Sequence, residues 1–134
     1  MKARWYHLML YVSNYRRSFA FYHAFFKFVG WRLTAKWPDG AGWTDGRTQL
    51  WIWKAAASHR RRAHHRKGVG MNHFTLSVSS QRDVDRFADA FLAPRKIRPL
   101  YGSPKRWPYG KTYYALFFED PDRMKIEVVY ARPR

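Results

Sequence analysis

The chain of 134 residues has no cysteine, only 9 acidic side chains and no long apolar run. The lack of cysteine excludes disulfides and thiolate metal sites, so a metal ion would need histidine, carboxylate, amide or water ligands. A membrane-spanning helix needs ~20 apolar residues in succession, which no segment approaches, and residues 1–7 lack the apolar stretch of a secretory signal. We therefore expect a cytoplasmic protein with no membrane association.

The shortage of acids leaves 26 lysines and arginines largely unbalanced, for a formal net charge of +17 at pH 7. Residues 1–67 carry 14 basic and 2 acidic side chains, whereas residues 68–134 carry 12 and 7. Such a charge attracts anions, whether nucleic acid or small anionic substrates. A compositional bias of the source proteome explains it equally well, because no recognition helix or RNA-binding signature accompanies the charge. Nucleic-acid binding is therefore an alternative that the sequence does not favour.

A stretch of sixteen residues occurs twice, at 7–22 and, 66 positions later, at 73–88. Six of the sixteen positions are identical, and the apolar spacing changes from strand-like to helical at the same point in both copies. A repeat of this kind indicates one domain built from two similar halves. Each half opens with a histidine on a predicted strand, His7 in the first and His73 in the second.

The two halves share one predicted order of elements, namely a strand, a helix and three strands. Ser13 or Asn14 and Ser80 are suited to cap the helices, because a short polar side chain accepts from the free N–H groups of a first helical turn. The helices are expected to end near Gly30 and at Ala93-Pro94. The predicted strands are 5–12, 31–37, 42–45 and 48–53, and then 72–78, 98–101, 112–118 and 125–130.

A basic connector, residues 55–68, separates the halves and contains His59, His64 and His65. Three histidines this close together suggest a metal site. The surrounding arginines and lysines favour an exposed, solvated segment instead.

Glu127 lies inside a predicted strand, flanked by isoleucine and valine. Burial of an unpaired charge is costly, so a carboxylate at such a position needs a partner. In the first half, Gln49 takes the corresponding place on the closing strand. With His7 and His73, the carboxylate would form a site for Fe, Mn, Co, Ni or Zn that leaves coordination positions open. A strand histidine is also commonly an ordinary core residue, so the pattern alone leaves both interpretations open.

Three motifs, spread over nearly the whole chain, resemble those of one known family. They are the opening run 7–22 with Val29-Gly-Trp31, the run 73–78, and the ending 113–122 followed by Lys-Ile-Glu127. The family is the vicinal oxygen chelate superfamily, which includes glyoxalase I, fosfomycin-resistance transferases, extradiol dioxygenases, methylmalonyl-CoA epimerase and bleomycin-resistance proteins.

The resemblance implies an α+β fold in which two βαβββ modules form a cupped, barrel-like mixed sheet around a divalent metal ion. Module one would span residues 1–54 and module two residues 69–134, joined by the connector 55–68 within one glyoxalase/dioxygenase-type domain, 1–134. Small members of the family usually form dimers, so the resemblance also implies a homodimer.

The resemblance assigns roles as well. His7, His73 and Glu127 match the family's metal ligands, and Gln49 matches a fourth position that only some members use as a ligand. Glu127 is also the candidate catalytic residue that moves a proton. The candidates for contact with a substrate are Trp51, Tyr101, Tyr109, Lys111, Tyr113 and Tyr114.

One motif departs from the family at its last turn. The family favours Asp-Pro-Asp-Gly-Asn, whereas this chain has Asp-Pro-Asp followed by Arg123 and Met124. Glycine adopts a positive φ at little cost, so Arg123 predicts a reshaped or strained turn shortly before Glu127.

On this resemblance, the leading hypothesis is a metal-dependent enzyme that binds two neighbouring oxygens of a small anionic substrate. The residues do not separate lyase or isomerase, transferase and dioxygenase chemistry. The alternative is a metal-free module that binds a drug or other ligand, and the third hypothesis is a nucleic-acid-binding protein.

Overall fold

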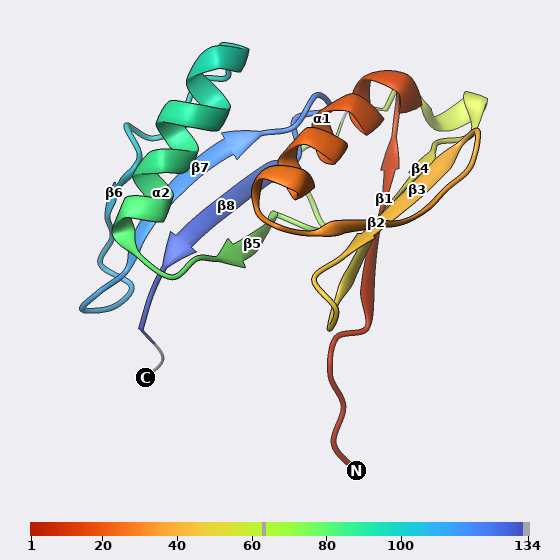
Figure 1. Ribbon diagram of the computed structural model, residues 1–134. Helices are drawn as coiled ribbons and strands as arrows, with labels where there is room; N and C mark the ends of the chain where they lie inside the picture. Colours follow the sequence, from red (N-terminus) through yellow and green to blue (C-terminus); the bar gives the residue numbers. More distant parts are fainter. Residues whose placement is uncertain (63, 133–134) are drawn as a thin grey trace. The chain divides into compact units, whose positions relative to one another are not determined.

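The computed structural model describes residues 1–62 and 64–132, so position 63 of the connector and the last two residues of module two lie outside the described residues. The chain divides into two compact units, Met1–Ala63 and His64–Arg134 (Figure 1). Each unit has the order of one strand, one helix and three strands, which confirms the α+β prediction of two βαβββ units. No helix among the described residues is long and apolar enough to cross a membrane.

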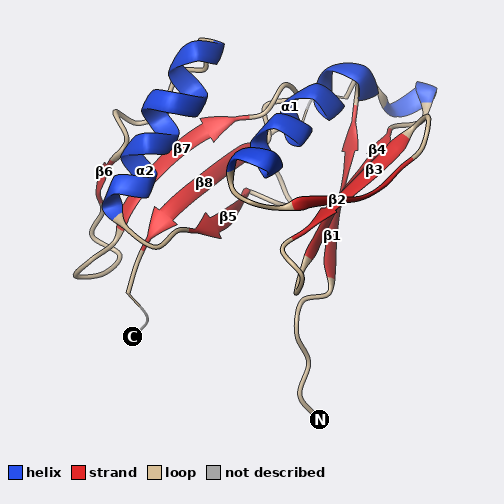
Figure 2. Cartoon of the chain, viewed as in Figure 1, coloured by secondary structure: helices blue, strands red, loops and turns tan. Residues whose placement is uncertain are grey.

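The first unit is a four-stranded mixed sheet with one helix against it (Figure 2). Its elements are β1 (His7–Val12), α1 (Tyr15–Phe28), β2 (Arg32–Lys36), β3 (Gly40–Thr44) and β4 (Gln49–Lys54). The strands lie in the order β1-β4-β3-β2, in which β1 and β4 are parallel and the other neighbours antiparallel. A short 3-10 turn, Ala57–His59, follows in the connector.

One stripe of α1 forms most of the core of this unit. Asn14 caps the helix, because its side chain accepts a hydrogen bond from Arg17 N at 3.0 Å. The helix ends before Gly30, whose φ of +83° favours glycine. Trp43 of β3 is fully buried against the stripe, with its ring 5.2 Å from that of Phe26. The buried aromatic residues of the stripe recur at helical spacing and are Phe21, Tyr22, Phe25 and Phe26.

The second unit repeats this topology with different loops. Its elements are β5 (His73–Ser77), α2 (Gln81–Phe87), β6 (Lys105–Arg106), β7 (Tyr114–Glu119) and β8 (Lys125–Tyr130). The strand order is β5-β8-β7-β6, with β5 and β8 parallel, as β1 and β4 are in the first unit. The Ser80 side chain caps α2, and the helix continues through a π turn, Ala88–Leu92, and a 3-10 turn, Ala93–Arg95.

One predicted strand is wrong. Residues 98–101, all of them described, form no strand. Tyr101 and Gly102 have φ angles of +60° and +63°, which an extended strand excludes. The strand that pairs with β7 is instead the two-residue β6, which lies outside every predicted strand.

The turn between β7 and β8 has the strain that the sequence predicts. Arg123 has a φ of +66°, a conformation that side chains with a Cβ rarely adopt. The Asp120 side chain holds the turn, because its Oδ1 accepts hydrogen bonds from the backbone N–H groups of Asp122 and Met124, both at 2.8 Å. This carboxylate therefore fixes the start of β8, the strand that carries Glu127.

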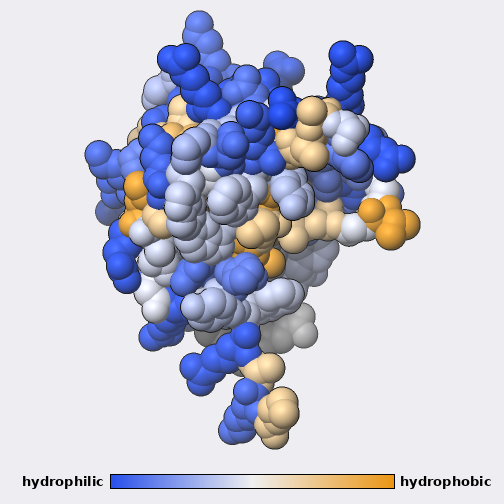
Figure 3. Space-filling view, turned by 90° about the vertical axis from the view of Figure 1, so that its right-hand side faces the viewer, coloured by the Kyte–Doolittle hydropathy of each residue, from blue (hydrophilic) through white to orange (hydrophobic). Residues whose placement is uncertain are grey.

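Basic side chains dominate the surface. The face shown in Figure 3 is mostly hydrophilic, with small and separate apolar patches. Ion pairs join Lys54 to Asp39, and join both Arg66 and Arg123 to Glu119. With 26 basic residues against 9 acidic ones, most of the positive charge has no acidic partner available.

Two substitutions at Arg123 test the strain in the turn. Both Arg123→Gly and Arg123→Ala lose the contact with Glu119, which contributes little because the arginine side chain is 68% exposed. Glycine adopts the positive φ freely, whereas alanine keeps the Cβ clash. We expect Arg123→Gly to exceed Arg123→Ala in free energy of unfolding by about 1 kcal/mol in urea denaturation. Equal stability of the two variants would contradict a left-handed Arg123.

Candidate functional site

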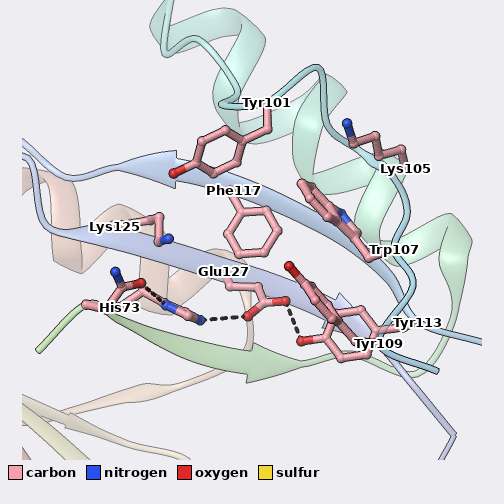
Figure 4. Close-up of a pocket in the computed structure, with 10 residues that line it drawn as sticks. His73, Tyr101, Lys105, Trp107, Tyr109, Tyr113, Phe117, Lys125 and Glu127 are labelled. Carbon is pink, nitrogen blue, oxygen red and sulfur yellow. Dashed lines mark hydrogen bonds and ion pairs between the residues drawn. The ribbon is translucent and has the colours of Figure 1, made fainter. Parts of the chain in front are cut away.

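One face of the second sheet forms a pocket of about 540 Å³. The opposite face packs against α2, where Phe118 stacks on Phe87 with ring centroids 5.3 Å apart. Because side chains alternate along a strand, Phe117 and Glu127 point to the other side, into the pocket (Figure 4). The residues that line it are Asn72, His73, Tyr101, Lys105, Trp107, Tyr109, Tyr113, Phe117, Lys125 and Glu127.

The Glu127 carboxylate is the polar centre of this pocket, and the residue is only 1% exposed. Its Oε2 accepts a hydrogen bond from the Thr75 hydroxyl at 2.7 Å and lies 3.1 Å from His73 Nε2. Its Oε1 accepts a hydrogen bond from the Tyr113 hydroxyl at 2.6 Å. These contacts provide the partners that a buried carboxylate requires.

Asn72 determines which nitrogen of His73 faces Glu127. The Asn72 side-chain nitrogen donates to the Arg66 carbonyl at 2.9 Å, which leaves its oxygen 2.6 Å from His73 Nδ1. An amide oxygen only accepts, so we assign the proton to Nδ1 and a lone pair to Nε2. Nε2 and the Glu127 oxygen are then two acceptors facing each other at 3.1 Å. Such a pair needs a shared cation, which is either an additional proton or a metal ion.

Tyr113 is kept in its neutral, proton-donating form. Burial is the main cause that raises the pKa of Tyr113 above its ordinary value, and the hydrogen bond to the Glu127 carboxylate adds to it. The phenol therefore carries a proton beside Glu127 at neutral pH.

The structure places three of the expected substrate-contacting residues in the pocket wall: Tyr101, Tyr109 and Tyr113. It places the other two of this segment elsewhere. Tyr114 follows Tyr113 in an extended stretch and faces the opposite side, where its hydroxyl donates to Asp85 of α2 at 2.7 Å. Lys111 is exposed in the turn before β7 and does not line the pocket. The expectation for Tyr114 and Lys111 is therefore corrected.

Other wall residues were absent from the expected set: Asn72, Lys105, Trp107, Phe117 and Lys125. A signal for Lys125 existed, because the strand alternation that directs Glu127 into the pocket directs Lys125 the same way. Lys105 lies in the two-residue β6 and Trp107 directly after it, in a segment whose path no apolar spacing predicts.

The strand register revises the comparison between the halves. In each sheet, the opening histidine pairs with a residue of the parallel strand, which is Lys125 in the second unit and Gln49 in the first. Two positions further along, these strands carry Glu127 and Trp51. Trp51, and not Gln49, therefore occupies the place of Glu127 in the repeat. Gln49 was matched to Glu127 because both are polar residues on a closing strand, whereas the strand register matches backbone positions.

The open face of the first sheet is aromatic. The Trp51 ring lies flat on β3, where a Cβ at Gly42 would approach it to 2.3 Å, so only glycine leaves room for the ring. The indole N–H donates to the Gln49 side-chain oxygen at 2.8 Å, and Trp37 stacks on Trp51 with centroids 5.7 Å apart. His7 is exposed at the start of β1. This unit thus presents an exposed imidazole and a tryptophan stack.

Comparisons with known proteins agree with this architecture. A family model described as the Glyoxalase/Bleomycin resistance protein/Dioxygenase superfamily matches residues 4–128. The uncharacterised protein YqjT of Bacillus subtilis is 35% identical over 123 residues, which are 92% of this chain and 95% of that protein. The crystal structure of a candidate glyoxalase from Bacillus halodurans matches with a TM-score of 0.86 at 28% identity and covers 95% of both chains. Lactoylglutathione lyase from Agrobacterium tumefaciens shares the fold, with a TM-score of 0.68 at 22% identity. That match covers 97% of this chain and 95% of the other.

Tyr113→Phe and Tyr114→Phe should each destabilise the protein. Each substitution removes a phenol hydrogen bond to a carboxylate, so each should lower the free energy of unfolding by about 2 kcal/mol at pH 7. Urea denaturation measures the effect, with Tyr11→Phe as the control, since the Tyr11 side chain is 72% exposed. The control should change stability by less than about 0.5 kcal/mol.

The stabilising effect of Tyr114 should depend on pH. The pKa of Tyr114 is raised from 10.0 to about 12. The hydrogen bond to Asp85 is the largest cause, and burial of the phenol is the second. As the pH rises, tyrosine therefore ionises in the unfolded chain before it ionises in the folded one. The stability difference between wild type and Tyr114→Phe should be full below pH 10 and should shrink between pH 10 and 12. A difference that stays constant or grows up to pH 11 would contradict this environment.

Proposed function

Because this chain belongs to the glyoxalase/bleomycin resistance protein/dioxygenase superfamily, we propose that it is a divalent-metal-dependent enzyme. Its substrate is a small anionic molecule that presents two neighbouring oxygens. The observation that carries the proposal is the pair of facing acceptors in the second unit, His73 Nε2 and Glu127 Oε2, at 3.1 Å.

The residues fit a metal ion in both chemistry and spacing. Imidazole nitrogen and carboxylate oxygen are ligands for Fe, Mn, Ni, Co and Zn, and two ligands ~2.1 Å from one ion at a right angle lie ~3 Å apart. Asn72 orients the imidazole from behind, and Thr75 and Tyr113 orient the carboxylate, as outer partners of metal ligands commonly do. The family resemblance alone supports His7 as the third ligand.

The described residues include no group of three or more histidine and acidic side chains arranged to hold an ion. His73 and Glu127 thus supply two of the donors. In the first unit, Trp51 stands where the repeat would place a second carboxylate, so the proposed set contains one carboxylate and no ligand from Gln49. This leaves coordination positions for the substrate.

The chain's own groups hold the Glu127 carboxylate in place and move protons. The bound ion would act as a Lewis acid on two substrate oxygens. Glu127 is the proposed proton carrier, and the Tyr113 hydroxyl, 2.6 Å from its Oε1, orients the carboxylate for that role. Trp107 and Phe117 line the same pocket and supply apolar wall next to the bound substrate. Isomerase, lyase, transferase and dioxygenase reactions all fit this arrangement.

A metal-free ligand-binding module is the second candidate. The observation in its favour is that an additional proton also satisfies the contact between His73 and Glu127. The aromatic pocket would then bind a ligand without chemistry. Metal content separates this candidate from the enzyme.

We also propose that the protein works in the cytoplasm as a homodimer, which the family resemblance supports. A homodimer would have twice the 16.2 kDa of one chain. Light scattering on the purified protein decides between this mass and that of a monomer.

Metal content tests whether His73 and Glu127 bind a divalent ion. Wild-type protein, purified without a histidine tag, should hold about one divalent ion per chain, and His73→Ala and Glu127→Ala should each lose it. His65→Ala in the connector and Tyr114→Phe should keep it. Iron would favour oxygen chemistry, whereas nickel, zinc or cobalt would favour isomerase or transferase chemistry.

A wild type that takes up none of these ions on reconstitution would contradict the metalloenzyme. If His65→Ala loses the metal and His73→Ala retains it, the metal site lies in the connector.

A further inference from the structure

Lys125 places an ammonium group at the wall of the pocket, with no acidic partner in the described structure. The residue is only 9% exposed, on β8, beside the His73 of the neighbouring strand. None of the described carboxylates forms an ion pair with it. Its nitrogen lies near two aromatic rings, with the centre of the Tyr101 ring at 5.5 Å and that of Phe117 at 5.4 Å.

This ammonium group is directed into the pocket. Lysine normally extends its charged end into open water, whereas here most of the residue is covered and the charge lies beside two aromatic rings. An anionic ligand in the pocket therefore meets a positive charge that no described carboxylate has paired.

The carboxylate in the same pocket is already engaged. Glu127 interacts with Thr75, Tyr113 and His73, and the proton or metal ion that the contact with His73 requires would offset its negative charge. Lys105 adds a second positive charge at the pocket wall, with its nitrogen 4.6 Å from the Trp107 ring centre. The charge left free to act on a ligand is thus positive.

The walls next to Lys125 are flat and rigid. Phe117 is packed edge-on against Trp107 and Tyr101, with ring centroids 5.1 and 5.7 Å apart and interplanar angles of 80° and 70°. Figure 4 shows these rings around the space into which Lys125 and Glu127 point. A volume of about 540 Å³ is sufficient for a small planar molecule.

We propose that Lys125 binds the anionic group of the substrate, and that this group is a carboxylate attached to a planar, aromatic or conjugated body. The ammonium pairs with the carboxylate, and the planar body lies against the rings of Tyr101, Trp107 and Phe117. The inference rests on the proposed function for the identity of the pocket, and it names the substrate class. The binding step itself requires no metal.

Calorimetric titration of metal-free protein with 2-naphthoate and with its neutral analogue 2-naphthamide tests this inference. In 0.15 M salt, which screens the surface charge, wild type should bind the acid about tenfold more tightly than the amide. Lys125→Met should abolish that preference, and Lys125→Arg should retain much of it. Lys111→Met removes the same charge from an exposed site, so it should keep the wild-type preference.

Methionine has a side chain of similar length and replaces the buried stem of Lys125, and thermal unfolding of Lys125→Met tests whether the variant folds. If that variant does not fold, the preference of wild type for the acid over the amide decides the question. Equal affinity for both compounds, no binding of the acid, or an unchanged preference in a folded Lys125→Met would overturn the inference.

Metal content separates this result from the proposed function. If only the inference fails, wild type and Lys125→Met still bind the metal ion. If only the metalloenzyme proposal fails, no ion binds, but the preference for the acid and its dependence on Lys125 persist.

Discussion

The buried carboxylate of Glu127 is the constraint on which the second unit depends. An acidic side chain that is 1% exposed is tolerated only with partners, and here they come from β5 and from the residue that precedes β7. Thr75, His73 and Tyr113 therefore hold two neighbouring segments against β8. The same contacts align a lone pair of His73 with a carboxylate oxygen. The contacts that stabilise Glu127 in the sheet thus also form a pair of electron donors suited to a cation.

The repeat has kept its backbone in both units and changed its chemistry. The strand order and the parallel pairing of first and last strands agree, yet Trp51 stands where Glu127 stands in the other unit. Gly42 makes this exchange feasible, because the indole ring occupies the space of its missing side chain. One unit thus carries a carboxylate and the other an aromatic face. This division favours a site with a single carboxylate, such as the one proposed for the metal ion.

The sequence predicted what depends on local spacing. The two-fold repeat, a helix cap at Ser13 or Asn14, a second cap at Ser80 and a reshaped or strained turn at Arg123 all follow from neighbouring residues. The structure has the repeat, caps at Asn14 and Ser80, and a positive φ at Arg123. Features that depend on pairing between distant strands were missed. The equivalence of Trp51 and Glu127 is set by a register that alternation alone does not reveal. The proposed role of Lys125 as an anion-binding residue likewise depends on which acidic residues lie near it in three dimensions.

The position of a bound ion is the most direct test of the account. Crystals grown with manganese or zinc and measured above the absorption edge of that metal would locate it by anomalous scattering. A peak is expected ~2.1 Å from both His73 Nε2 and Glu127 Oε2. A peak at the connector histidines instead, with His73 and Glu127 still in direct contact, would contradict it. The pair would then be a proton-sharing element of the core, and the pocket a binding site without a metal.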